Sequence, residues 1–437
     1  MRTRGLLLFI CLTVACCQAV YAGDTAHYTL RDLCRTANEN ARTIRIAAED
    51  VFIAQQEKKR ALSVLIPRAT AFGSHTNYKD TSFTSPDTTT VGVKLTQSFT
   101  LNGKELIAYD VSKKGIDKNR FTLESIRSDY LLQVALTYFD TLEAKRLLEI
   151  ADADVQRLAA HKKAVEEKLR VGSVTKTDLY RAEAELSRAM SDRVTAGSAV
   201  IQNKARILEL TGIDAPFAVS DADIMPMEGF QPTLATIQET ALQNRYEVQA
   251  AKKNLEIADQ TISFEKGDYW PKLNLETGYR ESDISYGDSG LAGGLTGETD
   301  ADTEDTYIQA ELVFTLYDGG LRKAQINQAM AGKRQAAQAL LQTRKDIILE
   351  SQVAFSDYET ARKVLINLAD ELKAAQENHK AVQMQYQYGM ADIIDMMDAN
   401  TLLVRAERSM SNARYALLQT MYKILHTQGE LVAYLLD

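Results

Sequence analysis

The chain has 437 residues and a formal net charge of −8 at pH 7. The first 22 residues carry two Arg and no acidic residue, which leaves 49 basic against 59 acidic residues and a net charge of −10 in the rest. This acidity argues against nucleic acid or an anionic membrane surface as a partner. Length alone suggests two or three domains, but the internal repeat described below replaces that expectation.

Residues 1–22 have the composition of a secretory signal peptide. Arg2 and Arg4 supply the positive start, and the apolar core runs from Gly5 to Ala15. The small residue Ala22 provides a cleavage site, so the mature chain is expected to begin at Gly23. The apolar core is too short for a membrane-spanning helix, and no later stretch is longer. Any membrane passage by the mature chain must therefore use another structure.

The cysteines leave lipidation open as an alternative and exclude an intrachain disulfide. Cys16 or Cys17 could be lipidated in place of simple signal cleavage, although Thr13 fits poorly where a lipoprotein signal has Leu. Cys34 is the only Cys outside the signal, so no intrachain disulfide is possible. It lies in an amphipathic helical pattern, which favours a buried, unreactive thiol.

Residues 23–212 are predicted to form a first repeat. In chain order its elements are a helix ending at Pro67, strands at about 68–78 and 90–101, a long helix from Lys104 to Leu169, a tip at 170–178 and a returning helix. A linker at 213–232, with Pro216, Pro226 and Pro232, follows. Residues 233–437 repeat the pattern, with strands at about 272–283 and 306–317 and a hairpin tip at 388–395.

Two constant offsets relate the copies. Asn40 and Asn244 are 204 residues apart, as are several neighbouring identical pairs up to Pro67 and Pro271. From Gly103 and Gly320 onward the spacing between identical residues is 217. The change of offset means that one loop is longer in the second copy. A fixed period of this kind predicts two structurally similar units.

The long helices follow from the positions of proline. None interrupts 104–169 or 321–388, and apolar residues recur there at helical spacing among Ala, Gln, Glu, Lys and Arg. At 1.5 Å per residue, helices of this length reach about 100 Å. Such lengths predict a coiled coil or a helical barrel, with an ordinary soluble bundle as the alternative.

The four short segments alternate between apolar and polar residues. Leu273, Leu275 and Tyr279 share one face of 272–280, while Asn274 and Glu276 share the other. Strands of about ten residues with one apolar face are typical of transmembrane β-barrels, although a soluble sandwich would show the same alternation. Four strands cannot enclose a lumen, so several chains would have to share one barrel.

Each hairpin tip carries an acidic residue with two interpretations. Thr175 and Asp392 are placed to cap the helices that follow, with Asp178 and Asp395 three residues later as in a capping box. An acid in the first turn also suits the helix dipole. Asp398 lies one turn beyond Asp395 on the same face, and capping does not explain it.

Four short sequence motifs resemble motifs of the TolC-like outer-membrane factor (outer membrane efflux protein) family. They are YWPKL at 269–273, LYDGG at 316–320, VGSVTKTD at 171–178 and YGMADIID at 388–395. The resemblance implies a mainly α fold with a membrane β-barrel portion, in which three chains share a twelve-stranded barrel in the outer membrane. The helices would continue it as a periplasmic tunnel, with the linker in an equatorial region. The tunnel would dock on a periplasmic adaptor and an inner-membrane pump of RND or ABC type.

The resemblance also assigns residues to an entrance. Asp395 and Asp398 match two acidic rings that narrow the periplasmic mouth, and Asp178 and Tyr386 match a polar network that holds it shut. Gly172 and Gly389 match the glycines of the two tips. The chain departs from the pattern at Ala391, where one well-known member has Arg, so not all of that member's inter-chain salt bridges can form here.

Two other classes of function compete with an export channel. A carboxylate pair could serve an enzyme, but no substrate surface, phosphate loop or His-x-x-x-His motif accompanies it, so no catalytic residue, cofactor or metal is predicted. A periplasmic adaptor or structural coiled-coil protein would share the hairpins but not the strands between them. The acidic loop 281–305 and a Met cluster at 384–397 could bind cations, but a solvated loop and adaptable packing are preferred. Drug, metal or protein cargo stays open.

Overall fold

The computed structural model describes residues 26–79, 87–213, 217–221, 224, 229–285 and 301–436. The predicted signal peptide, Pro216 and Pro226 lie outside these residues. The elements in chain order are β1 (Ala26–Tyr28), α2 (Leu30–Asn40), α3 (Arg42–Ser63), β2 (Arg68–Thr76), β3 (Asp87–Thr100), α4 (Lys104–Arg170), α5 (Lys176–Thr211), β4 (Phe217–Val219), α6 (Leu234–Asn244), α7 (Tyr246–Lys266), the 3₁₀ turn η2 (Gly267–Tyr269), β5 (Lys272–Ser285), β6 (Ala301–Val313), α8 (Leu321–Gln387), α9 (Ile393–Gln428) and α10 (Leu431–Leu436).

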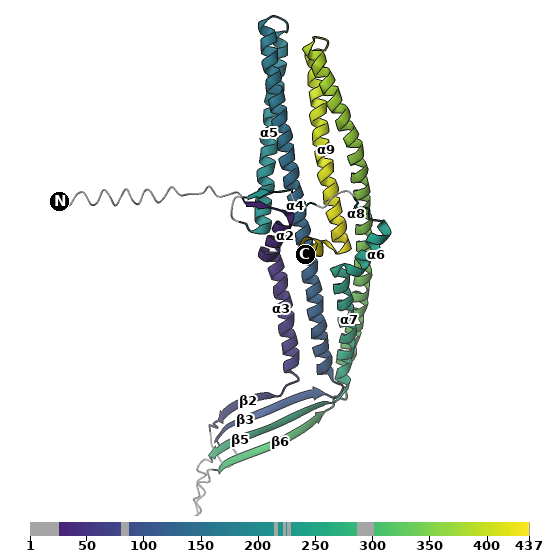
Figure 1. Cartoon of the computed structure of the whole chain (residues 1–437). Helices are drawn as coiled ribbons and strands as arrows, with labels where there is room; N and C mark the ends of the chain where they lie inside the picture. The colour runs from purple at the N-terminus through teal and green to yellow at the C-terminus, as the bar shows by residue number, and fades with distance from the viewer. Residues whose placement is uncertain are drawn as a thin grey trace, which may run out of the picture.

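The molecule is an elongated stack of a sheet and long helices. Figure 1 shows the sheet at one end, the two hairpin tips at the other, and the short elements α2, α6 and α10 between them. Helices α4 and α8 are 67 residues long each, close to the proline-free stretches of the sequence, and they run from the sheet to the tips. The two copies therefore lie side by side and in the same direction.

The strands and the helices keep the same lateral order. The sheet has the order β2-β3-β5-β6, with all neighbours antiparallel. Next to the sheet the helices pack in the order α3, α4, α7, α8, and towards the tips α5 packs on α4, α4 on α9, and α9 on α8. Each strand is thus continued by a helix, so the sheet and the helices form one curved wall.

The strand bounds differ from those expected. β3 and β5 extend further into the polar loops than predicted, to Asp87 and Ser285. β6 begins at Ala301 and ends at Val313, whereas the alternation predicted a strand at 306–317. The physical reason lies in the ladder, because Val313 is opposite Lys272, the first residue of β5. Among the described residues, β6 has no partner strand beyond that point.

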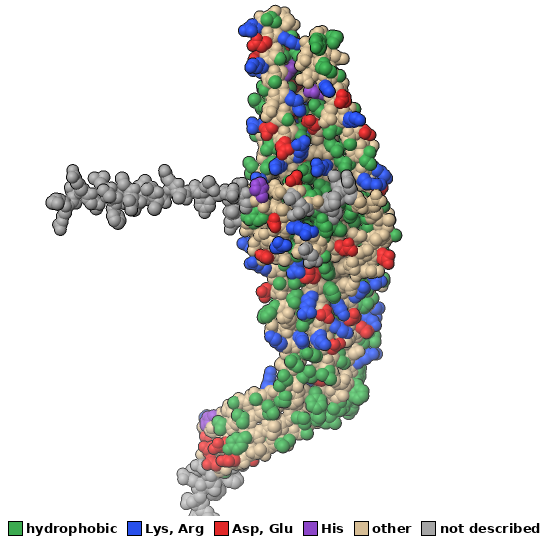
Figure 2. Space-filling view, viewed as in Figure 1, with side chains coloured by type: hydrophobic (Ala, Val, Ile, Leu, Met, Phe, Trp, Pro, Cys, Tyr) green, Lys and Arg blue, Asp and Glu red, His purple; other side chains and the backbone are tan. Residues whose placement is uncertain are grey.

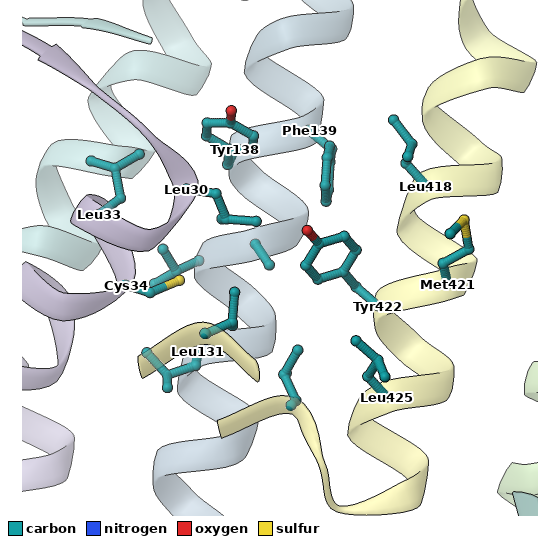
Figure 3. Close-up of a cluster of buried hydrophobic side chains, with 14 of the residues drawn as sticks. Leu30, Leu33, Cys34, Leu131, Tyr138, Phe139, Leu418, Met421, Tyr422 and Leu425 are labelled. Atoms are coloured by element: carbon teal, nitrogen blue, oxygen red, sulfur yellow. The ribbon is translucent and has the colours of Figure 1, made fainter. Parts of the chain in front are cut away.

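The main hydrophobic core lies at the middle of the molecule, where the repeats meet. Figure 3 shows Phe139 of α4 on the side that faces Leu418 and Tyr422 of α9, while Tyr138 and Leu131 of α4 lie on the side of Leu30 and Cys34 of α2. Phe139 and Tyr422 have ring centroids 5.0 Å apart. Cys34 is buried in the same core, and burial raises the pKa of its thiol to about 12, as the unreactive interpretation requires.

The linker between the repeats crosses this middle region. Its strand β4 pairs in parallel with β1, and the Tyr28 and Phe217 rings meet edge to face. The Phe230 carbonyl accepts a hydrogen bond from the Tyr358 hydroxyl of α8. These contacts fasten the described part of the linker to both copies.

A charged cluster ties the end of the second hairpin to both repeats. The Arg245 guanidinium donates to Glu247 and Glu350 at 2.9 Å each. The His426 ring lies 2.8 Å from Asp129 and 3.6 Å from Glu350. Arg245 and His426 are each 7% exposed, so burying these charges requires the surrounding carboxylates.

The surface of the sheet is unlike that of the helices. In Figure 2 green apolar side chains gather over the sheet and its junction with the helices, while Lys, Arg, Asp and Glu are spread along the helices. One face carries exposed Val93, Leu95, Ile308 and Leu312. On the other face Glu276 accepts from Lys94 at 3.2 Å and from the Tyr307 hydroxyl at 2.7 Å. Among the described residues, no helix combines the length and apolar character needed to cross a membrane.

Candidate functional site

The first hairpin tip is a tight, capped turn between α4 and α5. Gly172 has a φ of 78°, and the Ser173 N–H donates to the Lys168 carbonyl at 2.9 Å. This backbone favours Gly because its missing Cβ removes the steric cost of the left-handed region. Thr175 then caps α5, and the Asp178 carboxylate accepts from the Thr175 N–H and hydroxyl at 2.8 Å each. These bonds lower the pKa of Asp178. The predicted cap is therefore confirmed.

The second tip repeats this geometry between α8 and α9. Gly389 has a φ of 72°, and the Met390 N–H donates to the Gln385 carbonyl at 2.8 Å. Asp392 caps α9 by accepting from the Asp395 N–H at 2.9 Å, and Asp395 accepts from the Asp392 N–H at 3.2 Å. The predicted capping role of Asp395 is thus confirmed, and it uses only one of that residue's carboxylate oxygens.

Asp395 and Asp398 form an exposed acidic pair on α9. Both side chains are exposed and lie one helical turn apart. Among the described residues, Asp398 makes no hydrogen bond or ion pair, so none of their side chains neutralises its charge. The arrangement leaves the Asp398 carboxylate and the second oxygen of Asp395 able to interact with solvent, ions or another molecule.

A small apolar cluster joins the two tips. It consists of Val165 of α4, Ala182 of α5, Tyr386 of α8 and Ile393 of α9, with Val174, Leu179, Ala391, Met396 and Met397 packed around it. Tyr386 is 8% exposed despite its place near the end of the molecule. Ala391, where the family resemblance would allow a basic residue, is part of this packing. Apolar contact is therefore one force that holds the tips together.

Two basic side chains of α4 surround the Tyr386 ring. The Lys168 Nζ lies 3.7 Å from the ring centroid and donates to the Tyr386 carbonyl at 3.3 Å. The His161 ring is 5.3 Å away, centroid to centroid. Burial, followed by the Asp178 charge, raises the pKa of Tyr386, and burial, followed by Lys168, lowers the pKa of His161. The tip thus pairs a neutral phenol with a cation and a neutral imidazole.

Asp178 and Tyr386 are close enough for charge to act between them but are not hydrogen-bonded. The Asp178 carboxylate is engaged by Thr175, and the buried Tyr386 hydroxyl has no partner among the described residues. Sequence reasoning missed His161 and Lys168, which contact Tyr386 although more than 200 residues separate them. Their spacing of seven residues, two turns on one face of α4, was the available signal.

Above the central core the seam between the hairpins is polar. Asn400 of α9 donates to Asp154 of α4 at 2.9 Å, and Arg157 contacts Glu407 at 3.3 Å. Further towards the middle, Gln419 donates to Asp140 at 2.7 Å. The two hairpins are therefore clamped by apolar contacts at the tip and at the middle, with hydrogen bonds between.

The methionines near the second tip divide into two groups. Met396 and Met397 pack in the tip cluster, whereas Met384 and Met390 are exposed. Among the described residues no three His, Cys, Asp or Glu side chains are grouped so as to hold a metal ion.

The chain matches the family model described as outer membrane efflux protein over residues 33–213 and 237–426, which together are well over half of its length. It is 23% identical over 393 residues to the outer membrane protein TolC of Escherichia coli K12, which covers 89% of this chain and 79% of that protein. It is 22% identical over 404 residues to the TolC protein of Vibrio cholerae, and the aligned region covers 92% of this chain and 91% of that protein.

Solved structures share the fold. A membrane protein from Pseudomonas aeruginosa superposes with a TM-score of 0.80 at 18% identity, over 92% of this chain and 90% of the other. The outer membrane protein VceC of Vibrio cholerae superposes with a TM-score of 0.76 at 17% identity, over 92% of this chain and 96% of the other. The two ranges matched by the family model include both hairpin tips.

Proposed function

Because the chain belongs to the outer membrane efflux protein family, we propose that it is a subunit of an outer-membrane channel that gives exported molecules a passive way out of the cell. Proteins similar to it include the outer membrane efflux protein BepC of Brucella suis and the TolC proteins. The family consists of export channels, not enzymes, and we expect no catalysis from this chain.

The observation that carries the proposal is the continuity of the sheet with the helices. The order β2-β3-β5-β6 continues into α3, α4, α7 and α8, so a closed sheet would continue into a closed helical tunnel. An apolar face on the strands suits contact with outer-membrane lipid, and polar residues such as Lys94 and Glu276 would line the lumen. Four strands cannot enclose a lumen, so we propose that three copies share a twelve-stranded barrel.

The tunnel would end at the hairpin tips in the periplasm. There Asp395 and Asp398 of each copy would form stacked acidic rings, and the contacts of Tyr386 would keep the mouth narrow. We propose that a periplasmic adaptor and an inner-membrane pump, of RND or ABC type, dock at this end and supply the energy. The exposed, unpaired state of Asp398 supports a role towards the pore, because the fold of the single chain gives it none.

Fractionation of cells separates this proposal from a pore-free periplasmic coiled-coil protein. The channel should appear in the outer-membrane fraction as a trimer that resists detergent and falls apart on heating. A periplasmic adaptor would instead be released with the soluble periplasmic proteins or float with the inner membrane. Recovery of the chain in either of those fractions would refute the proposal.

A further inference from the structure

Two half-buried histidines lie in the seam between the hairpins, near the tips. His161 belongs to α4 and His379 to α8. In each ring the Nε2 atom is buried and has no hydrogen-bond partner among the described residues. A neutral imidazole keeps one ring nitrogen without a proton, whereas an imidazolium has an N–H at both. Protonation of either ring would therefore bury a charged group and leave a donor without an acceptor, which is costly.

The surroundings of His161 oppose a positive charge. Its ring lies 5.3 Å from the Tyr386 ring, centroid to centroid, and the two planes are tilted by 50°. The Lys168 ammonium already contacts that phenol ring, 3.7 Å from its centroid. Burial, followed by the charge of Lys168, lowers the pKa of His161. An imidazolium at this position would be a second cation beside one aromatic ring.

The elements packed around this ring supply no counter-charge. Among the residues that the structure describes, His161 forms no ion pair. From α5, Asp178 is hydrogen-bonded within the cap of its own helix, and Glu183 pairs with Lys162 at 3.3 Å. The nearby residue of α8, Tyr386, carries a neutral phenol whose pKa is raised by burial. Helix α9 contributes apolar side chains to the tip cluster, and its acidic pair is exposed.

We propose that protonation of His161 opens the periplasmic tips, so that the mouth of the channel responds to acid. The neutral ring packs between the hairpins against Tyr386. The charged ring is solvated only when the hairpins separate, because separation exposes Nε2 to water and lets water screen the charge of Lys168. The inference rests on the proposed channel and adds a regulation of its entrance.

The direction of the pH effect follows from this burial. Closed tips hold His161 with a lowered pKa, whereas open tips return it towards its ordinary value of about 6.5. The closed form therefore binds fewer protons than the open form. Its stabilisation by neutral His161 is complete above pH about 6.5 and is lost as pH falls through the lowered pKa. Acid thus favours the open form.

The acidic pair on α9 has the opposite sensitivity. In a narrow mouth shared by several chains, the carboxylates of Asp395 and Asp398 would repel one another. Protonation removes that repulsion and favours closure. Opening on acidification therefore distinguishes His161 from these carboxylates.

His379 provides a matched control in the same seam. Burial and the charge of Arg157 lower its pKa, but the charge of Glu407 on α9 acts in the other direction. Arg157 and Glu407 are themselves paired at 3.3 Å. A protonated His379 thus has a carboxylate nearby to offset its charge, which His161 lacks. We expect His379→Gln to keep the acid response.

Spin labels on the full-length protein measure the opening directly. In a Cys34→Ala background, Val171→Cys and Met390→Cys place one label on each tip, at positions that are 74% and 73% exposed. Co-expression with an excess of the cysteine-free chain leaves one labelled chain per particle, and each histidine variant is introduced into both chains. Double electron–electron resonance then reports the distance between the tips of one chain. Planar-bilayer recording of the same particles gives the resting conductance.

From pH 7.5 to pH 5, the protein with native histidines should show a longer distance and a conductance that rises several-fold. His161→Gln should stay closed at both pH values, and the always charged His161→Arg should be open at both. A distance that does not change with pH in the native-histidine protein would overturn the proposal. So would a full acid response in His161→Gln, or its loss in His379→Gln alone. If the distances follow the expected pattern but no protein conducts, the switch stands and the proposed channel is refuted.

Discussion

The Lys168 ammonium lies 3.7 Å from the centroid of the Tyr386 ring and donates to the carbonyl of the same residue, although the two belong to different hairpins. It thereby links the end of α4 in the first repeat to the end of α8 in the second. Partly desolvated cation–π contacts contribute about 0.5–2 kcal/mol. This contact therefore influences how tightly the two tips stay closed.

Lys168→Met should loosen the tips and raise the resting conductance of the channel. Met keeps the apolar stem of Lys but loses the charge that binds the ring and the carbonyl. Lys163→Met is the matched control. Lys163 is exposed on the same helix, and its substitution removes the same charge. Planar-bilayer recording compares the two. Equal conductance in both variants would mean that the Lys168 contact does not restrain the tips.

Replacing both Asp395 and Asp398 by Asn should lower cation selectivity and weaken block by trivalent cations. Carboxylates crowded in a narrow mouth focus a negative potential that concentrates cations. Asp392 still caps α9 in this variant, and the amide oxygen of Asn can accept from the Asp392 N–H in place of the carboxylate, so the tip should keep its fold. The reversal potential in an asymmetric salt gradient is the measurement. No change in it would leave capping as the better explanation of Asp395.

The connections from β2 to β3 and from β5 to β6, which the sequence predicted at 79–90 and 281–305, should be extracellular, and both tips periplasmic. Because the strands beside these loops alternate as membrane strands do, we expect the loops to lie beyond the membrane. Cysteines introduced at 290, 175 and 392, each in the Cys34→Ala background, can be labelled on intact cells with an impermeant maleimide. Only position 290 should react. Labelling at 175 or 392 without labelling at 290 would contradict the topology.

The cluster of His426, Glu350, Arg245 and Asp129 should make stability depend on pH. Burial opposes charge on His426, but the hydrogen bonds of Asp129 and Glu350 outweigh it and raise its pKa. Burial likewise opposes the Glu350 charge, yet His426 and Arg245 lower its pKa to about 2. The contribution of His426 to the free energy of unfolding is complete below its unfolded pKa of about 6.5, and it is lost as pH rises through the folded pKa. The Glu350 contribution is complete above an unfolded pKa of about 4.3 and is lost as pH falls towards the folded value.

His426→Gln should therefore lower the free energy of unfolding by about 1–2 kcal/mol at pH 5.5 and by less at pH 9. His379→Gln serves as the control. Burial lowers the pKa of His379, so its contribution has the opposite pH trend and is lost as pH falls. Thermal unfolding in detergent at the two pH values measures both. A His426 effect that grows with pH would contradict the arrangement of charges.

Much of the fold could be predicted because its signals are local. Proline positions predicted α4 and α8, and the Thr175–Asp178 and Asp392–Asp395 pairs predicted the caps at the helix starts. These features depend on residues within a few positions of one another. The constant offsets of 204 and 217 added the relation between the copies.

What could not be predicted depends on contacts between distant segments. The Lys168–Tyr386 and Asp129–His426 contacts join the two repeats, and no local pattern indicates which helix faces meet. The predicted end of β6 was wrong for a related reason. Alternation indicates which residues suit a strand, whereas the strand itself requires a partner, and residues 314–317 have none in the part of the chain that the structure describes.

The number of copies in the conducting particle tests the account most directly. Native mass spectrometry of the detergent-solubilised protein, on the same sample that conducts ions in a bilayer, should give three chains per particle, because four strands cannot enclose a lumen. A homogeneous monomer that still conducts would contradict the account.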